Sequence, residues 1–162
     1  EHVRQAISLS RRHGSQFALL FVDLDGFKSI NDRHGHVAGD ALLQELALRM
    51  KSCLREVDTV ARIGGDEFAV LLVDLDGRDA VLPLVQRLLS AMSQPVRQGP
   101  LSLQVSASIG LAYYPQAAEI GPAELMQQAD AAMYLAKRSG KNCYRIATDA
   151  SHLPGPAGLR HA

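Results

Sequence analysis

Residues Phe17 to Leu24 read FALLFVDL, an apolar run that is too short for a typical helix and is flanked by turn-forming residues. A short continuous run of this kind is typical of a strand that is buried on both faces of a sheet. The run ends in carboxylates, at Asp23 and Asp25. We therefore predict a buried central strand with acidic side chains at its carboxyl end.

The rest of the chain supplies helices and further strands. Apolar residues at helical spacing, with Gly and Pro as stop and start signals, predict helices over residues 1–13, 27–33, 37 or 39 to 54, 79–92 and 122–138. Strands are predicted as a hairpin over 57–63 and 68–73, a second pair over 95–98 and 101–113, and a last strand over 142–146. This order predicts an α/β (α+β) fold with a ferredoxin-like core, in which helices flank a mainly antiparallel central sheet.

Composition limits the function. The chain has 17 Lys and Arg and 17 Asp and Glu, so its charge balance does not indicate a basic surface that binds a polyanion. We therefore expect no nucleic-acid binding. Cys53 and Cys143 form no metal-binding or disulfide pattern, which indicates a reducing, cytoplasmic setting. No apolar run approaches the roughly 20 residues of a membrane helix, so we expect no direct membrane contact. A membrane anchor of a parent protein would lie outside this sequence.

The chain length of 162 residues suits a single domain. Residues 148–162 are rich in Pro, Gly and Ala and show no periodicity. We therefore predict one domain over residues 1–147, followed by a flexible tail or linker over 148–162.

Acidic side chains gather at two places. Asp23 and Asp25 lie two apart on the predicted strand and would point to one face, where two like charges are costly unless a cation compensates them. The hairpin tip adds Asp66 and Glu67 beside two glycines, which permit positive φ and the close approach of an anionic ligand. Hard oxygen ligands without His or Cys suit Mg²⁺. The pattern indicates a magnesium site, with a solvated strand end and an ordinary turn as the alternatives.

Five motifs in order resemble the GGDEF diguanylate cyclase family. Residues 62–68 read RIGGDEF, which contains the signature for which the family is named. Upstream, residues 23–32 read DLDGFKSIND and residues 35–40 read GHVAGD, similar to D-x-D-x-F-K-x-x-N-D and G-H-x-x-G-D. Downstream, residues 108–110 read SIG and residues 129–142 read ADAAMYLAKRSGKN, similar to the family's S-x-G strand and A-D-x-A helix end. Five ordered motifs are far more specific than one.

The resemblance implies a palm-like fold, with the signature on a β-hairpin, that joins two GTP molecules into cyclic di-GMP. Two Mg²⁺ ions, or Mn²⁺ in their place, would be bound by Asp23, Asp66, Glu67 and the Leu24 carbonyl. Asp66 would be the general base for the ribose 3′-hydroxyl, or would act mainly as a ligand of a metal that lowers the pKa of that hydroxyl. Glu67 would be a second catalytic acid, with metal support or a surface charge as its alternatives, and Lys28 would stabilise the transition state.

The family's substrate-binding positions correspond to Asn31, His36 and Asp40 in this sequence. A carboxylate at Asp40 can accept from the N1 and N2 protons of guanine, a donor pair that adenine lacks. Taken without the family, Asn31 and Asp40 could cap helices and His36 could be a packing residue.

The family's phosphate-binding positions resemble Lys137 and Lys141, near the end of the last predicted helix. Gly64 and Gly65 would let the triphosphate approach the hairpin backbone. Lys141 stands where the family often has Arg, so bidentate gripping of a phosphate is lost and we expect weaker nucleotide affinity.

Residues 55–58 match the R-x-x-D pattern of the family's product-inhibition site. The resemblance implies that Arg55 and Asp58 bind cyclic di-GMP as an allosteric inhibitor, while a surface ion pair is the alternative. Two domains must face one another for catalysis, so a homodimer is implied. The family usually has a D-x-L-T-x-L-x-N-R segment ahead of the first helix, and this sequence starts after that point, so we expect Arg62 to lack its customary acidic partner. We expect fused sensory or phosphodiesterase domains outside this sequence, and weak activity of the isolated domain.

Two other functions are open. One is a non-catalytic module that binds GTP or cyclic di-GMP and regulates an attached domain. The other is a different palm-like nucleotidyl transferase, such as an adenylate-type cyclase, against which Asn31 and Asp40 argue. None of the signature positions is broken, which favours the cyclase.

Overall fold

The computed structural model describes residues 1–148, so the tail predicted over 148–162 lies, apart from Thr148, outside the described residues. Across the described part of the chain, no helix is long and apolar enough to span a membrane. The elements follow in the order α1 (His2–His13), β1 (Phe17–Asp25), α2 (Phe27–His34), α3 (His36–Cys53), β2 (Thr59–Gly64), β3 (Glu67–Leu72), the 3₁₀ turn η1 (Arg78–Ala80), α4 (Val81–Ser93), β4 (Val96–Gln98), β5 (Leu101–Leu103), β6 (Ser106–Tyr114), α5 (Pro122–Arg138) and β7 (Cys143–Ile146).

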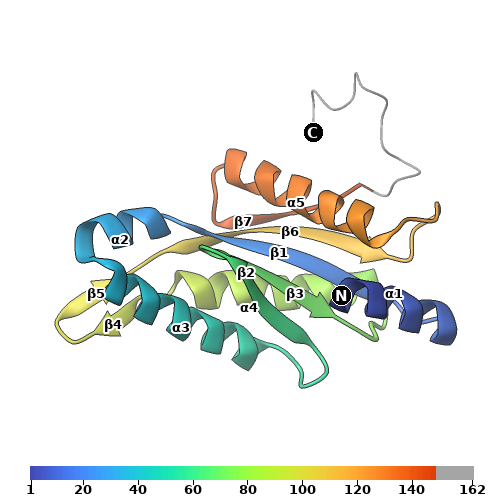
Figure 1. The fold of residues 1–162 in the computed structure, drawn as a ribbon, viewed down its shortest axis with the longest axis horizontal. Helices are drawn as coiled ribbons and strands as arrows, with labels where there is room; N and C mark the ends of the chain where they lie inside the picture. Colours follow the sequence, from blue (N-terminus) through green and yellow to red (C-terminus); the bar gives the residue numbers. More distant parts are fainter. Residues whose placement is uncertain (149–162) are drawn as a thin grey trace.

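A five-stranded sheet forms the centre of the fold, in the order β2-β3-β1-β6-β7. The first four strands run antiparallel to their neighbours, and β7 runs parallel to β6. Figure 1 shows α5 on one face of this sheet and α3 and α4 on the other. The predicted α+β class, with a mainly antiparallel sheet flanked by helices, is confirmed.

Strand β1 occupies the middle of the sheet because it is apolar on both faces. Its side chains alternate between two cores, and each core is closed by different helices. One core, shared with α3 and α4, receives Ala18, Leu20, Val22 and Leu24. The other, shared with α1 and α5, receives Phe17, Leu19 and Phe21. The prediction of a central strand buried on both faces is confirmed.

The single strand predicted over residues 101–113 is wrong. The chain leaves the strand conformation at Gln104 and Val105, so β5 pairs only with β4 in a separate two-stranded sheet while β6 joins the central sheet. At the break, the Gln104 side chain donates a hydrogen bond of 2.9 Å to the Ser93 carbonyl at the end of α4. This contact lies at the point where the chain passes from one sheet to the other.

Helix α5 lies directly on β6 at Gly110, where the absence of a side chain lets the two backbones meet. The close packing fixes the position of the helix over β1 and β6. The end of α5 that carries Lys137 is thereby brought to the carboxyl end of β1.

Candidate active site

The hairpin tip lies against the carboxyl end of β1. The register of β1 with β3 pairs Asp23 with Glu67, and the Leu24 N–H donates to the Asp66 carbonyl at 3.1 Å. Gly65, at φ +50°, and Asp66 form the turn between β2 and β3. The structure thus brings together Asp23, Leu24, Asp66 and Glu67, and Gly64 ends β2 beside them.

The carboxylate of Asp25 has a different environment from that of Asp23. It is 6% exposed and accepts hydrogen bonds from the Ser106 hydroxyl at 2.6 Å and the Ser108 hydroxyl at 2.7 Å. The Asn142 N–H donates to it at 3.1 Å. These bonds join β1 to β6 and to the turn after α5. The interpretation of Asp23 and Asp25 as a matched metal-binding pair therefore needs correction, because Asp25 is held inside the protein by its own donors.

The cation that compensates the two aspartates in the structure is Lys137. Its ammonium lies 3.2 Å from Asp23 Oδ2 and 3.0 Å from Asp25 Oδ1. It also donates to the Leu24 carbonyl at 3.3 Å. Lys137 therefore contacts three oxygens at the end of β1, including two of the groups predicted to bind metal.

Burial and the neighbouring charges shift the pKa values of these groups in opposite directions. Burial, the largest effect, raises the pKa of Asp23 to about 6, with Lys137 lowering it and the charges of Asp66 and Glu67 raising it further. Burial also acts to raise the pKa of Asp25, but its hydrogen bonds outweigh burial and lower the pKa below the ordinary value. For Lys137, burial lowers the pKa, and the two aspartates more than reverse this effect.

The donor set at the end of β1 fits Mg²⁺ only in part. Asp23 Oδ1 is buried and has no hydrogen-bond partner, so one carboxylate oxygen is free to bind a cation. Within residues 1–148, no group of three or more His, Cys, Asp or Glu side chains is arranged to hold a metal ion. A metal here would draw on the Leu24 carbonyl, water and a bound triphosphate, the kind of mixed set that Mg²⁺ commonly uses.

Asp40 lines an open pocket of about 520 Å³ between α3 and strand β2. Both apolar and polar side chains line the pocket, and Gln44 and Lys51 on later turns of α3 are among the polar ones. Gln44 and Lys51 could not be predicted from the sequence, because their place beside Asp40 depends on which face of α3 borders β2. The lining residues are Asp40, Leu43, Gln44, Ala47, Lys51, Val60, Ala61, Arg62 and Phe68.

Asn31 lies near the end of α2, against α3. The N-cap positions of α2 and α3 are Gly26 and Gly35, so neither Asn31 nor Asp40 has that capping role. The Oδ1 atom of Asn31 is buried without a hydrogen-bond partner, and a Cβ at Gly39 would lie 1.7 Å from it. Gly39 therefore makes the space that the Asn31 side chain occupies.

Several predicted site residues are exposed, among them Lys28 on α2, His36 at the start of α3, and Lys141. Lys141 and Asn142 both have positive φ, 64° and 47°, in the turn that follows α5. Since the Asn142 N–H bonds to Asp25, the turn that carries Lys141 is tied to the end of β1. Arg62, at the end of β2, donates to the Gly65 carbonyl at 2.8 Å.

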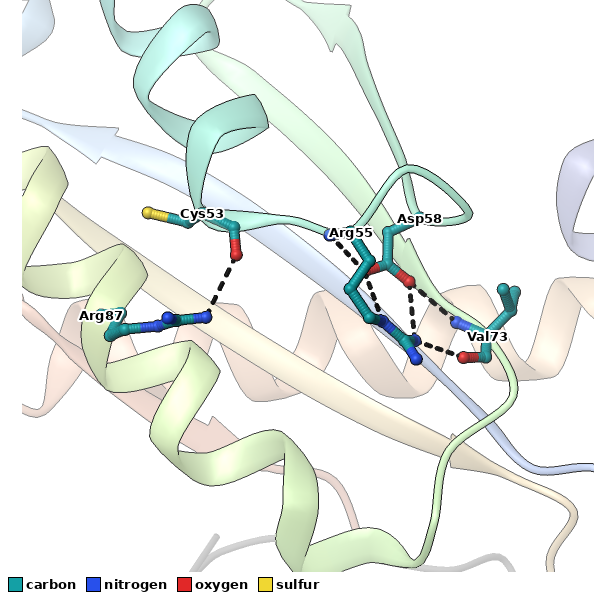
Figure 2. A network of polar contacts seen from close by, with 5 residues as sticks. All are labelled: Cys53, Arg55, Asp58, Val73 and Arg87. Carbon is teal, nitrogen blue, oxygen red and sulfur yellow. Dashed lines mark hydrogen bonds and ion pairs between the residues drawn. The ribbon is translucent and has the colours of Figure 1, made fainter.

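Arg55 and Asp58 form a closed turn before β2 (Figure 2). The Arg55 N–H donates to Asp58 Oδ2 at 2.9 Å, and the Arg55 guanidinium approaches Oδ1 at 3.0 Å. The Val73 N–H donates to Oδ1 at 3.3 Å. The Asp58 side chain is 0% exposed, whereas that of Arg55 is 53% exposed. The pair is therefore more than a surface ion pair, because the buried carboxylate of Asp58 closes the turn and also accepts from Val73.

The chain is similar to known proteins along nearly its whole length. It is 44% identical over 144 residues to diguanylate cyclase TpbB of Pseudomonas aeruginosa, covering 88% of this chain and 33% of TpbB. It is 45% identical over 144 residues to the bifunctional diguanylate cyclase/cyclic di-GMP phosphodiesterase MucR of the same organism, covering 89% of this chain and 21% of MucR. The chain thus spans a third or less of these relatives.

The fold is also similar to solved structures. The crystal structure of the GGDEF domain of TpbB from Pseudomonas aeruginosa matches with a TM-score of 0.86 at 42% identity, covering 91% of each chain. Residues 1–143 match the family model described as diguanylate cyclase, GGDEF domain. Sequence, fold and the placement of the hairpin acids beside Asp23 agree, and the chain belongs to the GGDEF domain family.

Proposed function

We propose that this chain is the catalytic domain of a diguanylate cyclase, which joins two GTP molecules into cyclic di-GMP and releases two pyrophosphates. The observation that carries the proposal is the pairing of Asp23 with Glu67, which places the hairpin acids beside the end of β1. The similarity to TpbB, which is named a diguanylate cyclase and is 44% identical to this chain, supports the same reaction.

In each of two identical steps, a ribose 3′-hydroxyl attacks the α-phosphorus of the other GTP. A bond forms between O3′ and phosphorus, and the bond to the bridging oxygen breaks, so that pyrophosphate leaves. The hydroxyl proton passes to Asp66 as general base or, where Asp66 is mainly a metal ligand, to solvent. Each chain would hold one GTP, so the reaction requires a homodimer whose two sites face each other.

Magnesium, or Mn²⁺ in its place, would be held by Asp23, the Leu24 carbonyl, Asp66 and Glu67. When bound, the metal would supply positive charge that offsets the triphosphate and the charge that develops during phosphoryl transfer. The unpaired, buried Oδ1 of Asp23 supports this assignment. Lys28, Lys137 and Lys141 would provide further positive charge for the phosphates.

Guanine would bind in the pocket lined by Asp40, with Asn31 and His36 nearby on α2 and α3. The carboxylate of Asp40 would accept the N1 and N2 protons of guanine. Adenine would leave this carboxylate without donors, so GTP is selected over ATP. Gly64 and Gly65, at the hairpin turn, would allow the triphosphate to pass close to the backbone.

The product would inhibit the enzyme by binding at the site formed by Arg55 and Asp58, where Arg55 is the residue that the ligand can contact. The exposed side of the Arg55 guanidinium is the part that a phosphate or guanine of cyclic di-GMP can reach. The buried Asp58 would hold Arg55 in the required orientation through its existing bonds.

The test is to incubate the purified domain at high protein concentration with GTP and Mg²⁺ and to detect cyclic di-GMP by chromatography. We expect product from the wild type, none from Asp66→Ala, and none from ATP. Circular dichroism of Asp66→Ala checks that this variant is folded. A wild type that dimerises and binds GTP without forming product would contradict the proposal.

A second function rests on the mixed activities of the relatives, since MucR carries both diguanylate cyclase and phosphodiesterase in its name. In such a protein this domain could bind GTP or cyclic di-GMP and regulate the neighbouring phosphodiesterase. Binding of GTP without turnover, together with a change in the activity of an attached phosphodiesterase, would support this function over the first.

A further inference from the structure

Lys137 contacts oxygens that a metal would also need. Its ammonium lies 3.2 Å from Asp23 Oδ2 and donates to the Leu24 carbonyl at 3.3 Å. A magnesium ion binds oxygen at roughly 2.0–2.1 Å, much closer than an ammonium does. Asp23 Oδ1 is free, but a metal that also binds the Leu24 carbonyl or Asp23 Oδ2 on the side where the ammonium lies must displace it.

Asp25 gives the ammonium a place to remain when it leaves Asp23. Lys137 is 3.0 Å from Asp25 Oδ1, and that carboxylate is fixed by Ser106, Ser108 and the Asn142 N–H. Helix α5 itself is fixed, because it lies directly on β6 at Gly110. The flexible four-carbon stem of the lysine can therefore change position while the helix and Asp25 remain in place.

We propose that Lys137 is the resident counter-cation of this site, which competes with the metal for Asp23 and the Leu24 carbonyl and gives way to it when nucleotide binds. The proposal rests on the proposed function in one respect, namely that Asp23 and Leu24 bind metal. Without nucleotide, the ammonium stabilises two adjacent carboxylates that would otherwise repel each other. A metal that uses these oxygens beside the free Oδ1 of Asp23 must displace the ammonium, so metal binding to the protein alone is weakened.

A triphosphate changes this balance because it offers the displaced ammonium a new anionic partner. Metal and GTP then bind cooperatively, and the coupling is reciprocal: each raises the affinity of the other by the same factor. The device would keep the site from being filled by metal before substrate arrives. Lys137 thus has a role in the empty site that is distinct from holding a phosphate.

The test measures Mn²⁺ binding by electron paramagnetic resonance in the absence of nucleotide. Lys137→Met keeps most of the stem and removes the charge, and we expect it to bind Mn²⁺ at least about fivefold more tightly than the wild type. Lys141→Met is the matched control, since it removes the same charge from an exposed position on the neighbouring turn. We expect the Mn²⁺ affinity of Lys141→Met to stay within about twofold of the wild type, well below that coupling.

A second measurement uses the wild type, so that it does not depend on the folding of Lys137→Met. Acetic anhydride labels free amines, and mass spectrometry reports the labelling of Lys137 relative to Lys141. Saturating Mn²⁺ without nucleotide is expected to increase the labelling of Lys137, because its ammonium loses two of its three partners.

Unchanged labelling of Lys137, or a Lys137→Met variant that binds Mn²⁺ no better than the wild type, would overturn the proposal. These outcomes are separate from product formation. If the wild type makes cyclic di-GMP but Lys137→Met shows no gain in Mn²⁺ affinity, the cyclase proposal stands and the counter-cation proposal is overturned. If Lys137→Met gains Mn²⁺ affinity but the wild type makes no cyclic di-GMP, the counter-cation proposal is supported and the cyclase proposal is contradicted.

Discussion

A Cβ atom at Gly110 on β6 would lie 2.1 Å from the carbonyl oxygen of Ala129 on α5. The same atom would lie 2.2 Å from the backbone nitrogen of Met133, so both obstacles belong to the helix backbone and cannot move aside as a side chain could. The glycine of the S-I-G motif is therefore needed for packing, because only a residue without a side chain lets β6 and α5 lie this close.

We expect Gly110→Ala to destabilise the domain by about 3 kcal/mol or more, because α5 must shift to admit the methyl group. The free energy of unfolding in urea measures the effect. Gly121→Ala is the control: it lies at the start of the same helix, with nothing within 4 Å of its added Cβ, and should cost less than about 1 kcal/mol. Equal losses in the two variants would show that contact with α5 is not the cause.

Gly39→Ala is expected to act on substrate binding through Asn31, whose Oδ1 lies 1.7 Å from the position of the added methyl. The displaced Asn31 can no longer present its amide, so the KM for GTP should rise roughly as much as in Asn31→Ala. Because the two changes act through one side chain, the double variant should be no worse than the single ones. Additive increases in KM would show that Gly39 and Asn31 act independently.

Asp23→Asn is expected to stabilise the metal-free domain at neutral pH. The pKa of Asp23 is raised to about 6, so the folded protein binds an extra proton between the ordinary value of 3.8 and about 6, and stability falls as pH rises through this interval. The variant should gain on the order of 1 to 3 kcal/mol over wild type at pH 7 and almost nothing near pH 4. Urea unfolding in EDTA at several pH values measures the difference.

Asp25→Asn, measured in the same way, is expected to change stability in the opposite direction. The pKa of Asp25 is lowered, so its ionised form stabilises the fold above the ordinary value, and this contribution is lost only as pH falls through the lowered pKa. The variant should therefore be less stable than wild type at pH 7. If the two variants shifted stability in the same direction at pH 7, the assigned environments of the two carboxylates would be wrong.

Asp58→Ala is expected to destabilise the domain by about 1 to 3 kcal/mol, because the N–H groups of Arg55 and Val73 lose their buried acceptor. Arg55→Met should cost less, since the guanidinium is half exposed. Both variants should weaken inhibition by cyclic di-GMP, measured as the product concentration that halves the initial rate. An Asp58→Ala variant as stable as the wild type would contradict the role of the Asp58 carboxylate as a buried acceptor.

Features that depend only on residues close together in the chain could be predicted from the sequence. The start of α5 at Pro122, the end of α1 before Gly14 and the hairpin around Gly65 all follow from local chemistry. The acids at the hairpin tip and at the end of β1 could be expected to meet because five motifs resemble one family. The roles of those acids in catalysis remain predictions.

Features that depend on distant contacts could not be predicted. Asp25 has the same side chain as Asp23, yet its donors come from Ser106, Ser108 and Asn142, far along the chain. The break before β6 and the parallel direction of β7 likewise depend on packing against helices. No local pattern marks which aspartate will be enclosed by partners and which will keep a free oxygen.

The central place of β1 has a consequence for how the chain is made. Its two neighbours are β3 and β6, and β6 ends at Tyr114, 89 residues after Asp25 (114 minus 25). At about 5 to 20 residues per second, a ribosome needs roughly 4 to 18 s to add them. During that interval the most apolar strand of the nascent chain is without one of its partners, and a chaperone that shields Phe17 to Leu24 would protect the domain when it is most prone to aggregate.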